Sequence, residues 1–491
     1  MTELWKLTAL DAVELLKKRE ISPLDMVESC AARIEATEGG LNAMPTLCLD
    51  RARDHARAMM DGKAAAYDGP GALHGLPMAV KELENVAGVR TTYGAPLWKD
   101  NVPERSDIMV ERLEERGAIV MGKSNVPEYG AGGVSFNEVL GSTANPWDQS
   151  RTPGGSSGGS AAALAAGQVP IATGSDLGGS LRIPASFCGI VGFRPSSGIV
   201  AKGPDAGCFA DMPVVGPMAR NVPDTALMLD AMAGFHMEDP LARAEPAVPY
   251  LKQVRAALSG GRGPGRIGYS PDLGVTPVDG EVDAICRAAT QRLADLGADI
   301  VEARIDFTGA PEAFHTFRAL GFATGHEDEL RNHRDKLKPE NIWNTEKGLK
   351  LTIDEILRAN RIRGALFHRV ADYFKSHDLL ALPSTIVPAL PMHMRYLKEL
   401  NGHKFGNYVD WIILTSVITL TVCPAISIPC GFTKSGLPVG LQLVGRPHGD
   451  GELLAWAAQA ERLFDLAGQL PIDPRGERGR HPDPEPEPHG D

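Results

Sequence analysis

Residues 152–192 constrain this chain most, because they place two serines in separate glycine-flanked loops. Ser156 lies in the sequence Gly-Gly-Ser-Ser-Gly-Gly, and Ser180 follows Asp-Leu-Gly-Gly. Glycine has no Cβ, so it lets backbone N–H groups converge on one point and lets a ligand approach the main chain closely. The residues between the loops predict a helix of small residues over 160–167 and a short strand over 168–173. We therefore expect both hydroxyls to be held on one frame.

Two other stretches belong with this segment. Val80-Lys81-Glu82 ends an apolar run that predicts a buried strand, and residues 424–445 contain two further strand-like runs. Together the three stretches resemble the amidase signature hydrolases, and the likeness extends over most of the chain. In that family a lysine and two serines cooperate, and the motifs match Lys81, Ser156 and Ser180 at the spacing that the family pattern leads us to expect.

The resemblance implies an enzyme that cleaves the carbon–nitrogen bond of carboxylic amides through an acyl group on serine. A serine hydroxyl is a poor nucleophile and needs a base. We assign Ser180 as the nucleophile, Ser156 as the proton relay and Lys81 as the base, which must be uncharged to act. Burial at the end of a strand favours the neutral amine. The resemblance also implies a cis peptide bond between Gly155 and Ser156.

The residues around the two serines are assigned supporting roles. The backbone amides of residues 177–180 are expected to form an oxyanion hole, because they can surround the oxygen that gains charge when Ser180 attacks. By resemblance, three residues near the serines brace the two loops, and a stretch of five residues borders the substrate bond that is cleaved. The small side chains of that stretch suggest a roomy or mobile wall. The oxyanion-hole residues are Leu177, Gly178, Gly179 and Ser180; the bracing residues are Ser157, Asp176 and Arg182; the substrate-binding residues are Tyr129, Gly130, Ala131, Gly132 and Gly133.

Helix-like and strand-like patterns alternate along much of the chain, which favours an α/β fold. The resemblance specifies it as the amidase signature fold, a central mixed β-sheet flanked by helices on both faces. We expect a single domain over residues 1–474, in which residues 307–406 interrupt the alternation and form a helical cap or insertion. Residues 475–491 are rich in proline and charge and are expected to be a disordered tail.

Composition excludes several classes of function. The net charge of −12 disfavours a nucleic-acid partner. Seven cysteines without metal-ligand spacing predict reduced thiols in a cytoplasmic protein, and the N-terminus does not resemble a signal peptide.

Residues 411–433 carry no charge and are long enough to span a membrane, but their threonines, serines and two prolines favour a buried helix followed by a strand. The expected partner is a small amide or carbamate substrate, and a homodimer is possible.

Several motifs suggest other chemistry. Residues 117–124 fit the phosphate-loop formula, but their middle is typical of a strand and not of an amide cradle. Residues 154–158 fit the nucleophile elbow, but no buried strand precedes Ser156. Cys188 lies among apolar residues, which favours an inert thiol, and the thirteen histidines show no ligand spacing. We therefore expect no metal and no cofactor.

The sequence leaves alternatives open. Taken alone, Lys81 could be a surface charge, Ser156 a helix cap and Ser180 a loop hydroxyl. The substrate could be an amide, an anilide, a carbamate (a urethane) or an ester. The same core also occurs in the glutaminase component of tRNA-dependent amidotransferases, the A subunit, which releases ammonia from glutamine for a partner protein. A third possibility is a binding protein that keeps the amidase frame without catalysis.

Overall fold

A mixed β-sheet of eleven strands runs through the part of the chain that the computed structural model describes, which comprises residues 3–63, 67–204 and 207–481. β2 pairs in parallel with β3 and β6, β9 pairs in parallel with β10 and β11, and the other pairs are antiparallel. The expected α/β class with a mixed sheet is thereby confirmed. In sheet order the strands are β1 Thr46–Leu47, β3 Ala118–Ser124, β2 Leu76–Lys81, β6 Ile171–Asp176, β8 Val214–Ala219, β7 Val191–Arg194, β14 Ala425–Phe432, β15 Pro438–Val444, β11 Leu379–Pro383, β9 Arg266–Tyr269 and β10 Asp299–Glu302.

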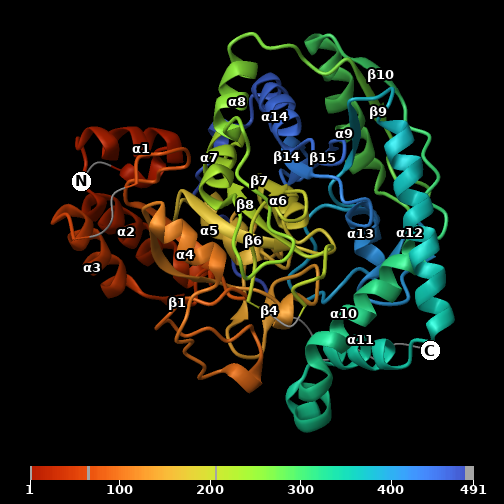
Figure 1. Ribbon diagram of the computed structural model, residues 1–491, viewed down its shortest axis with the longest axis horizontal. Coiled ribbons are helices and arrows are strands. Elements are labelled where there is room, and N and C mark those ends of the chain that lie inside the picture. The colour runs from red at the N-terminus through yellow and green to blue at the C-terminus, as the bar shows by residue number, and fades with distance from the viewer. Residues whose placement is uncertain (1–2, 64–66, 205–206, 482–491) are drawn as a thin grey trace.

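Helices surround this sheet (Figure 1). α1 to α3 lie at one side of the molecule, and α10, α11 and α12 pack together at the opposite side. Two short hairpins, β4 Phe136–Asn137 with β5 Gly141–Ser142 and β12 Glu399–Leu400 with β13 His403–Lys404, lie outside the main sheet. The helices are α1 Ala9–Lys18, α2 Pro23–Leu41, α3 Leu49–Met60, α4 Ile108–Glu115, α5 Gly158–Ala165, α6 Arg182–Cys188, α7 Val222–Met232, α8 Tyr250–Leu258, α9 Gly280–Arg292, α10 Ala310–His333, α11 Pro339–Leu349, α12 Ile353–Tyr373, α13 Ile413–Thr419 and α14 Asp450–Phe464.

α5 and β6 are the elements that carry the two serine loops. Every residue of α5 is buried, and its glycines, serine and alanines let it lie close to neighbouring backbone: a Cβ on Gly159 would overlap residue 125. β6 begins at Ile171, three residues later than the apolar pattern predicts, and continues through Asp176. Gly167 adopts a positive φ of +77° and Pro170 lacks an N–H, so the turn after α5 is longer than expected. Asp176 therefore ends a strand, where its backbone is held by pairing with Val214.

The uncharged stretch at residues 411–433 folds as its threonines and prolines predict. It contains the buried helix α13 followed by β14, which is paired on both sides in the sheet. Across the described residues, helices long and apolar enough for a bilayer crossing are absent. The interval between β10 and β11 holds the three helices α10 to α12, and α10 contacts α13.

The first part of the expected C-terminal tail makes contacts with the rest of the chain. Residues 475–481 lie against residues 142–150: the Arg475 N–H donates to Pro146 O at 3.0 Å, and the Gly479 N–H donates to Gln149 O at 2.8 Å. The Arg475 guanidinium also lies over the Trp147 ring at 4.8 Å. Such local backbone pairings are not visible in the composition of a tail. The rest of the expected tail, residues 482–491, lies outside the described residues.

Candidate active site

Lys81 lies at the end of β2 and is fully buried. Its backbone N–H donates to Thr173 Oγ1 at 2.9 Å, which ties β2 to β6 beside the site. The side-chain Nζ lies among three hydroxyls, at 2.9 Å from Ser156 Oγ, 2.8 Å from Ser157 Oγ and 2.8 Å from Ser175 Oγ. The surface-charge interpretation of Lys81 is therefore wrong, and the sequence reasoning missed Ser175 as its third hydroxyl partner.

Burial lowers the pKa of Lys81 to about 8, against the opposing effect of the Glu84 and Asp176 carboxylates. A charged ammonium has three donors and no acceptor, whereas a neutral amine has a lone pair that accepts a proton. Glu84 is itself buried, and burial raises the pKa of its carboxyl. The environment of Lys81 therefore moves its amine toward the uncharged form that a base requires.

Ser156 is 2% exposed and follows a cis peptide bond from Gly155, as the resemblance implied. The N-cap of α5 is Ser157 and not Ser156, and the side chain of Ser157 makes no capping bond. The helix-cap interpretation of Ser156 is therefore wrong. A Cβ on Gly130 would lie 3.2 Å from Ser156 Oγ, so the glycine at position 130 lets the chain pass close to the serine.

Ser180 lies between β6 and α6 and is half-buried. Its carbonyl oxygen accepts a hydrogen bond from the Ser157 N–H at 3.3 Å, which joins the two serine loops directly. Within residues 3–63, 67–204 and 207–481, the Ser180 hydroxyl makes no hydrogen bond, and Ser156 Oγ is paired with Lys81. The structure thus pairs Lys81 with Ser156 and holds the Ser180 loop beside them, while the two serine hydroxyls do not bond each other.

One of the four backbone N–H groups expected to form the oxyanion hole, that of Gly179, already has a partner in the structure. The Gly179 N–H donates to Asp176 Oδ1 at 3.0 Å, so this amide is already occupied. The N–H groups of Leu177, Gly178 and Ser180 donate to no other group in the described part of the chain. Three unpaired amides within one short loop are suited to bind a negatively charged oxygen.

Asp176 anchors this loop through two guanidinium groups. Arg182 Nη2 lies 2.8 Å from Asp176 Oδ1 and Arg182 Nε lies 3.0 Å from Oδ2, while Arg194 Nη1 lies 3.3 Å from Oδ1. The side chains of Asp176 and Arg182 are 0% exposed. Burial alone would raise the pKa of Asp176, but Arg182 and Arg194 outweigh it and hold the pKa below its usual range. The sequence reasoning found Arg182 and missed Arg194, whose only signal is its position at the end of a buried strand.

The wall formed by residues 129–133 is closely packed, contrary to the roomy or mobile wall that its small residues suggested. A Cβ on Gly133 would overlap the Trp411 ring, and a Cβ on Gly155 would lie within 3.0 Å of the backbone at residues 132–133. Lys338 Nζ donates to Ala131 O at 2.5 Å from the start of α11. Neighbouring groups closely approach Gly130 and Gly133, whereas a Cβ on Gly132 would make only ordinary contacts. Residues at the beginning of α11 hold this wall.

Tyr129 has a left-handed backbone conformation, with φ of +50°, and its ring lies 4.3 Å from that of His326 on α10. The Tyr129 N–H donates to Tyr93 O at 2.9 Å. Glu128, the preceding residue, is buried and accepts from Asn341 Nδ2 at 2.6 Å and from the Lys338 N–H at 3.0 Å. The side chains of α10 and α11 therefore fix the position of Tyr129 next to the Ser156 loop.

The competing motifs do not form the sites that they resemble. Residues 118–124 are a strand, and the buried Lys123 donates to Glu84 O at 2.6 Å. Cys188 lies on α6 and is fully buried, and burial raises the pKa of its thiol. Among the residues with described positions, no three or more His, Cys, Asp or Glu side chains are grouped so as to hold a metal ion.

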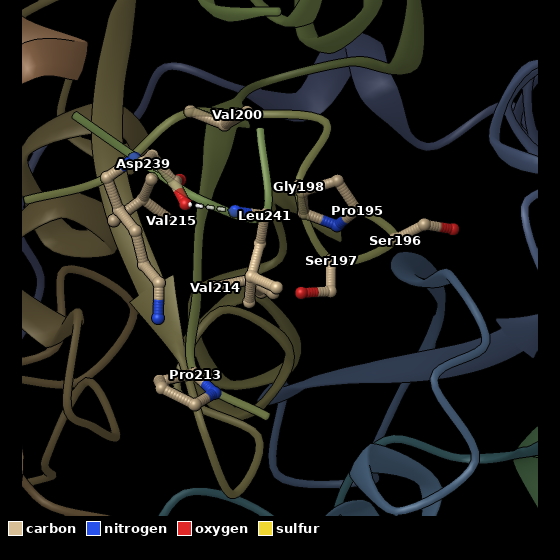
Figure 2. A pocket seen from close by; sticks show the side chains of 11 residues that line it. Pro195, Ser196, Ser197, Gly198, Val200, Pro213, Val214, Val215, Asp239 and Leu241 are labelled. Atoms are coloured by element: carbon tan, nitrogen blue, oxygen red, sulfur yellow. Dashed lines mark hydrogen bonds between the residues drawn. The ribbon is translucent and has the colours of Figure 1, made fainter. Parts of the chain in front are cut away.

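A small pocket elsewhere, drawn in Figure 2, lies between the segment after β7 and the beginning of β8. Its carboxylate, Asp239, accepts from the N–H groups of Leu241 at 2.8 Å and Lys202 at 3.0 Å. None of its lining residues is Lys81, Ser156 or Ser180, so we do not place the reaction there. The lining residues are Pro195, Ser196, Ser197, Gly198, Val200, Lys202, Pro213, Val214, Val215, Asp239 and Leu241.

Comparison with known proteins agrees with this geometry. Residues 25–454 match the family described as Amidase. The chain is 33% identical to an acylamidase of Rhodococcus erythropolis, over 95% of this chain and 97% of that protein. It is 35% identical to the A subunit of the glutamyl-tRNA(Gln) amidotransferase of Anaeromyxobacter dehalogenans (strain 2CP-C), over 96% of this chain and 98% of that protein.

A solved structure is also similar: a bacterial aryl acylamidase of the amidase signature family superposes with a TM-score of 0.85 at 26% identity, over 95% of this chain and 99% of that one. The family match, the relatives and this fold agree with one another. The chain therefore belongs to the amidase signature family and is an amide-hydrolysing enzyme.

Proposed function

We propose that this enzyme hydrolyses carboxylic amides through an acyl group carried on Ser180, with Ser156 as the proton relay and Lys81 as the base. The observation that carries the proposal is the buried contact of 2.9 Å between Lys81 Nζ and Ser156 Oγ, in a loop that bonds directly to the Ser180 backbone. A lysine held away from water beside a hydroxyl is suited to accept its proton.

In the first step, Ser180 Oγ attacks the substrate carbonyl carbon. The Ser180 proton passes to Ser156 Oγ while the Ser156 proton passes to Lys81 Nζ. Because the Ser180 hydroxyl has no hydrogen-bond partner among the described residues, it is available to turn toward Ser156 when substrate is bound. The oxygen that becomes negative would accept from the N–H groups of Leu177, Gly178 and Ser180.

In the next steps, the carbon–nitrogen bond breaks and the proton on Lys81 returns through Ser156 to the departing nitrogen. The amine leaves, and the acyl group stays on Ser180. A water molecule then attacks this ester, its proton follows the same route, and the carboxylic acid is released with Ser180 restored. A carbamate would react in the same way: the amine leaves, Ser180 carries an alkoxycarbonyl group, and water releases a carbonic acid monoester that loses carbon dioxide to give the alcohol.

An aryl amide or anilide is the substrate class that we propose. The similarity to an acylamidase in sequence and to an aryl acylamidase in structure supports this class. The test is turnover of a panel of anilides, short aliphatic amides, carbamates and esters by the wild type and by Ser180→Ala. We expect the anilides to be hydrolysed by the wild type and not by the variant. Equal rates for the two proteins on every substrate would contradict the assignment of Ser180.

A second candidate is the glutaminase role of an amidotransferase A subunit, because one relative with that name is 35% identical over nearly the whole chain. Ammonia release from glutamine by the purified chain distinguishes the two. Under the amidase proposal, glutamine is a much poorer substrate than an anilide. Release of ammonia from glutamine that exceeds anilide turnover, or that increases when a co-purifying partner and tRNA are added, would favour the second candidate.

A further inference from the structure

The peptide bond between Gly178 and Gly179 is held at both ends by buried side chains. Its carbonyl oxygen, on Gly178, accepts from Thr415 Oγ1 at 2.7 Å. Its N–H, on Gly179, donates to Asp176 Oδ1 at 3.0 Å. Thr415 lies on α13 and is 1% exposed, so a helix from a distant part of the sequence contacts the loop that carries Ser180.

A second hydroxyl, that of Ser416, lies near the same carbonyl. Ser416 Oγ is 3.2 Å from Gly178 O and 2.9 Å from Ile412 O, whereas Thr415 Oγ1 is 2.7 Å from Gly178 O and 3.0 Å from Ile412 O. Each hydroxyl has one proton to donate. The shorter contacts therefore assign Thr415 to Gly178 O and Ser416 to Ile412 O.

The contacts around this peptide bond close into a ring. Arg182 Nη2 bonds Asp176 Oδ1 at 2.8 Å, and Arg182 Nη1 bonds the backbone oxygen of Thr415 at 3.0 Å. Gly179 has a φ of +114°, and a Cβ at this position would overlap the Thr415 side chain. Glycine at position 179 is thus required both by the backbone conformation and by the close approach of Thr415.

We propose that Thr415 is a positioning residue for the oxyanion site, an inference that rests on the proposed function of Ser180. A peptide bond is planar, so fixing the carbonyl oxygen of Gly178 and the N–H of Gly179 fixes the orientation of that plane. The N–H groups of Gly178 and Ser180 belong to the peptide units on either side of it, so their directions depend on this plane together with the backbone torsions of Gly178 and Gly179. Donors that are aimed before the reaction stabilise the developing charge without reorganising during the reaction.

The test compares substitutions that separate the hydroxyl from the rest of the side chain. Thr415→Val removes the donor and keeps the shape, and Thr415→Ser keeps the donor. Thr421→Val is the matched control, because Thr421 is also buried in this segment but donates to Ile418 O at 2.7 Å. For each variant we measure kcat and KM on an anilide, the second-order rate of labelling of Ser180 by a fluorophosphonate, and the affinity for an arylboronic acid.

We expect Thr415→Val to lower kcat and the labelling rate by about 10- to 100-fold, less than the ~10²–10³ caused by loss of a direct oxyanion donor. KM should change little, and boronic acid affinity should fall together with kcat. Thr415→Ser and Thr421→Val should both stay close to the wild type. Cysteine is similar in size to threonine but is a weaker hydrogen-bond donor, so the kcat and labelling rate of Thr415→Cys should lie between those of the serine and valine variants. If Thr415→Val does not fold, Thr415→Cys replaces it in the test.

Two results would overturn the positioning role alone. In one, the wild type is active, and a folded Thr415→Val has the same kcat, labelling rate and boronic acid affinity as the wild type. In the other, Ser416→Ala causes the loss that we assign to Thr415 while Thr415→Val does not. If the wild type neither turns over amides nor labels at Ser180, the proposed function itself is wrong, and the positioning role falls with it.

Discussion

Lys81 is in contact with three hydroxyls, and its protonation state decides what those contacts do. As an ammonium it donates to Ser156, Ser157 and Ser175, and it holds them in place. As a neutral amine it keeps two donors and gains a lone pair, which only one of the three hydroxyls can use. The proposed reaction requires that this hydroxyl is the one on Ser156. The contacts to Ser157 and Ser175 then orient the amine toward it.

The pH dependence of the reaction follows from this side chain. Burial lowers the pKa of Lys81 to about 8, so the ammonium dominates below that pH, and the amine that the proposed reaction requires dominates above it. We expect kcat/KM for an anilide to rise with pH through about 8 and then to level off. A profile that is flat from well below to well above this pH, for a substrate that does not itself titrate, would contradict Lys81 as the base.

Substitution of the three groups that we propose to react gives a second prediction at this scale. Lys81→Ala and Ser180→Ala should each lower turnover by orders of magnitude while the circular dichroism spectrum and the melting temperature show a folded protein. Ser156→Ala should be slow but keep residual activity, because a water molecule can partly replace the relay. Cys188→Ala is the matched control. Loss of activity in Cys188→Ala with activity retained in Ser180→Ala would reverse the assignment of the nucleophile.

The sequence alone identifies those residues of the candidate site that lie in a motif. It does not identify the residues that reach the site from other parts of the chain. Lys81, Ser156 and Ser180 each lie in a recognisable local pattern. Arg194 and Thr415 reach the Ser180 loop from a strand and a helix outside the motif. Arg194 is marked only by its position at the end of a buried strand, and nothing in the neighbourhood of Thr415 marks it. The occupied amide of Gly179 is also unpredictable, because it depends on where the Asp176 carboxylate points.

At the scale of elements, the Ser180 loop is held by a buried ion cluster at the end of β6. Asp176 faces both Arg182 and Arg194, and all three side chains are buried. Removing one charge from such a cluster leaves the others without compensation, which costs more than the pair itself contributes. The same carboxylate also accepts from the Gly179 and Leu181 N–H groups, so its charge fixes the loop backbone.

Asp176→Asn should therefore lower the free energy of unfolding by about 3–5 kcal/mol, as measured by urea denaturation. The control is Asp372→Asn, which removes a charge from an ion pair with Lys375 whose side chains are 76% and 75% exposed, and which should cost less than about 1 kcal/mol. Equal stabilities for the two variants would show that the buried cluster does not anchor the loop.

Element types are predictable where the apolar pattern is long, and element boundaries are less so. The strand ending in Lys81 and the helix and strand within residues 411–433 agree with their sequence patterns. The strand before Ser180 begins three residues later than predicted, because the apolar run starts before Pro170 while hydrogen bonding starts after it. The small residues at 130–133 suggest space, but what fills that space, Trp411 and the neighbouring loop, comes from elsewhere in the chain.

At the scale of the whole molecule, Arg33 on α2 joins the two ends of the described chain to the helix that follows Ser156. Arg33 Nε donates to Ala166 O at 2.7 Å, just after α5, and Nη2 donates to Ile472 O at 2.8 Å. Nη1 lies 2.7 Å from Asp473 Oδ1. The residue is only 7% exposed, and Trp5 covers its guanidinium, with the Arg33 Cζ 4.0 Å from the ring centroid.

Arg33→Met keeps the apolar stem but leaves two buried carbonyl oxygens without a donor. An unsatisfied buried acceptor costs about 1–3 kcal/mol, so we expect the two carbonyl oxygens together to cost about 2–6 kcal/mol of the free energy of unfolding. Arg358→Met is the control, since Arg358 is 58% exposed in its pair with Glu312 and should matter little. The contact between Arg33 and Ala166 O lies at the C-terminal end of α5, away from Ser157. Under conditions in which Arg33→Met is folded, its kcat should therefore equal that of the wild type. A lowered kcat with an unchanged free energy of unfolding would mean instead that α5 transmits the position of the chain ends to the Ser156 loop.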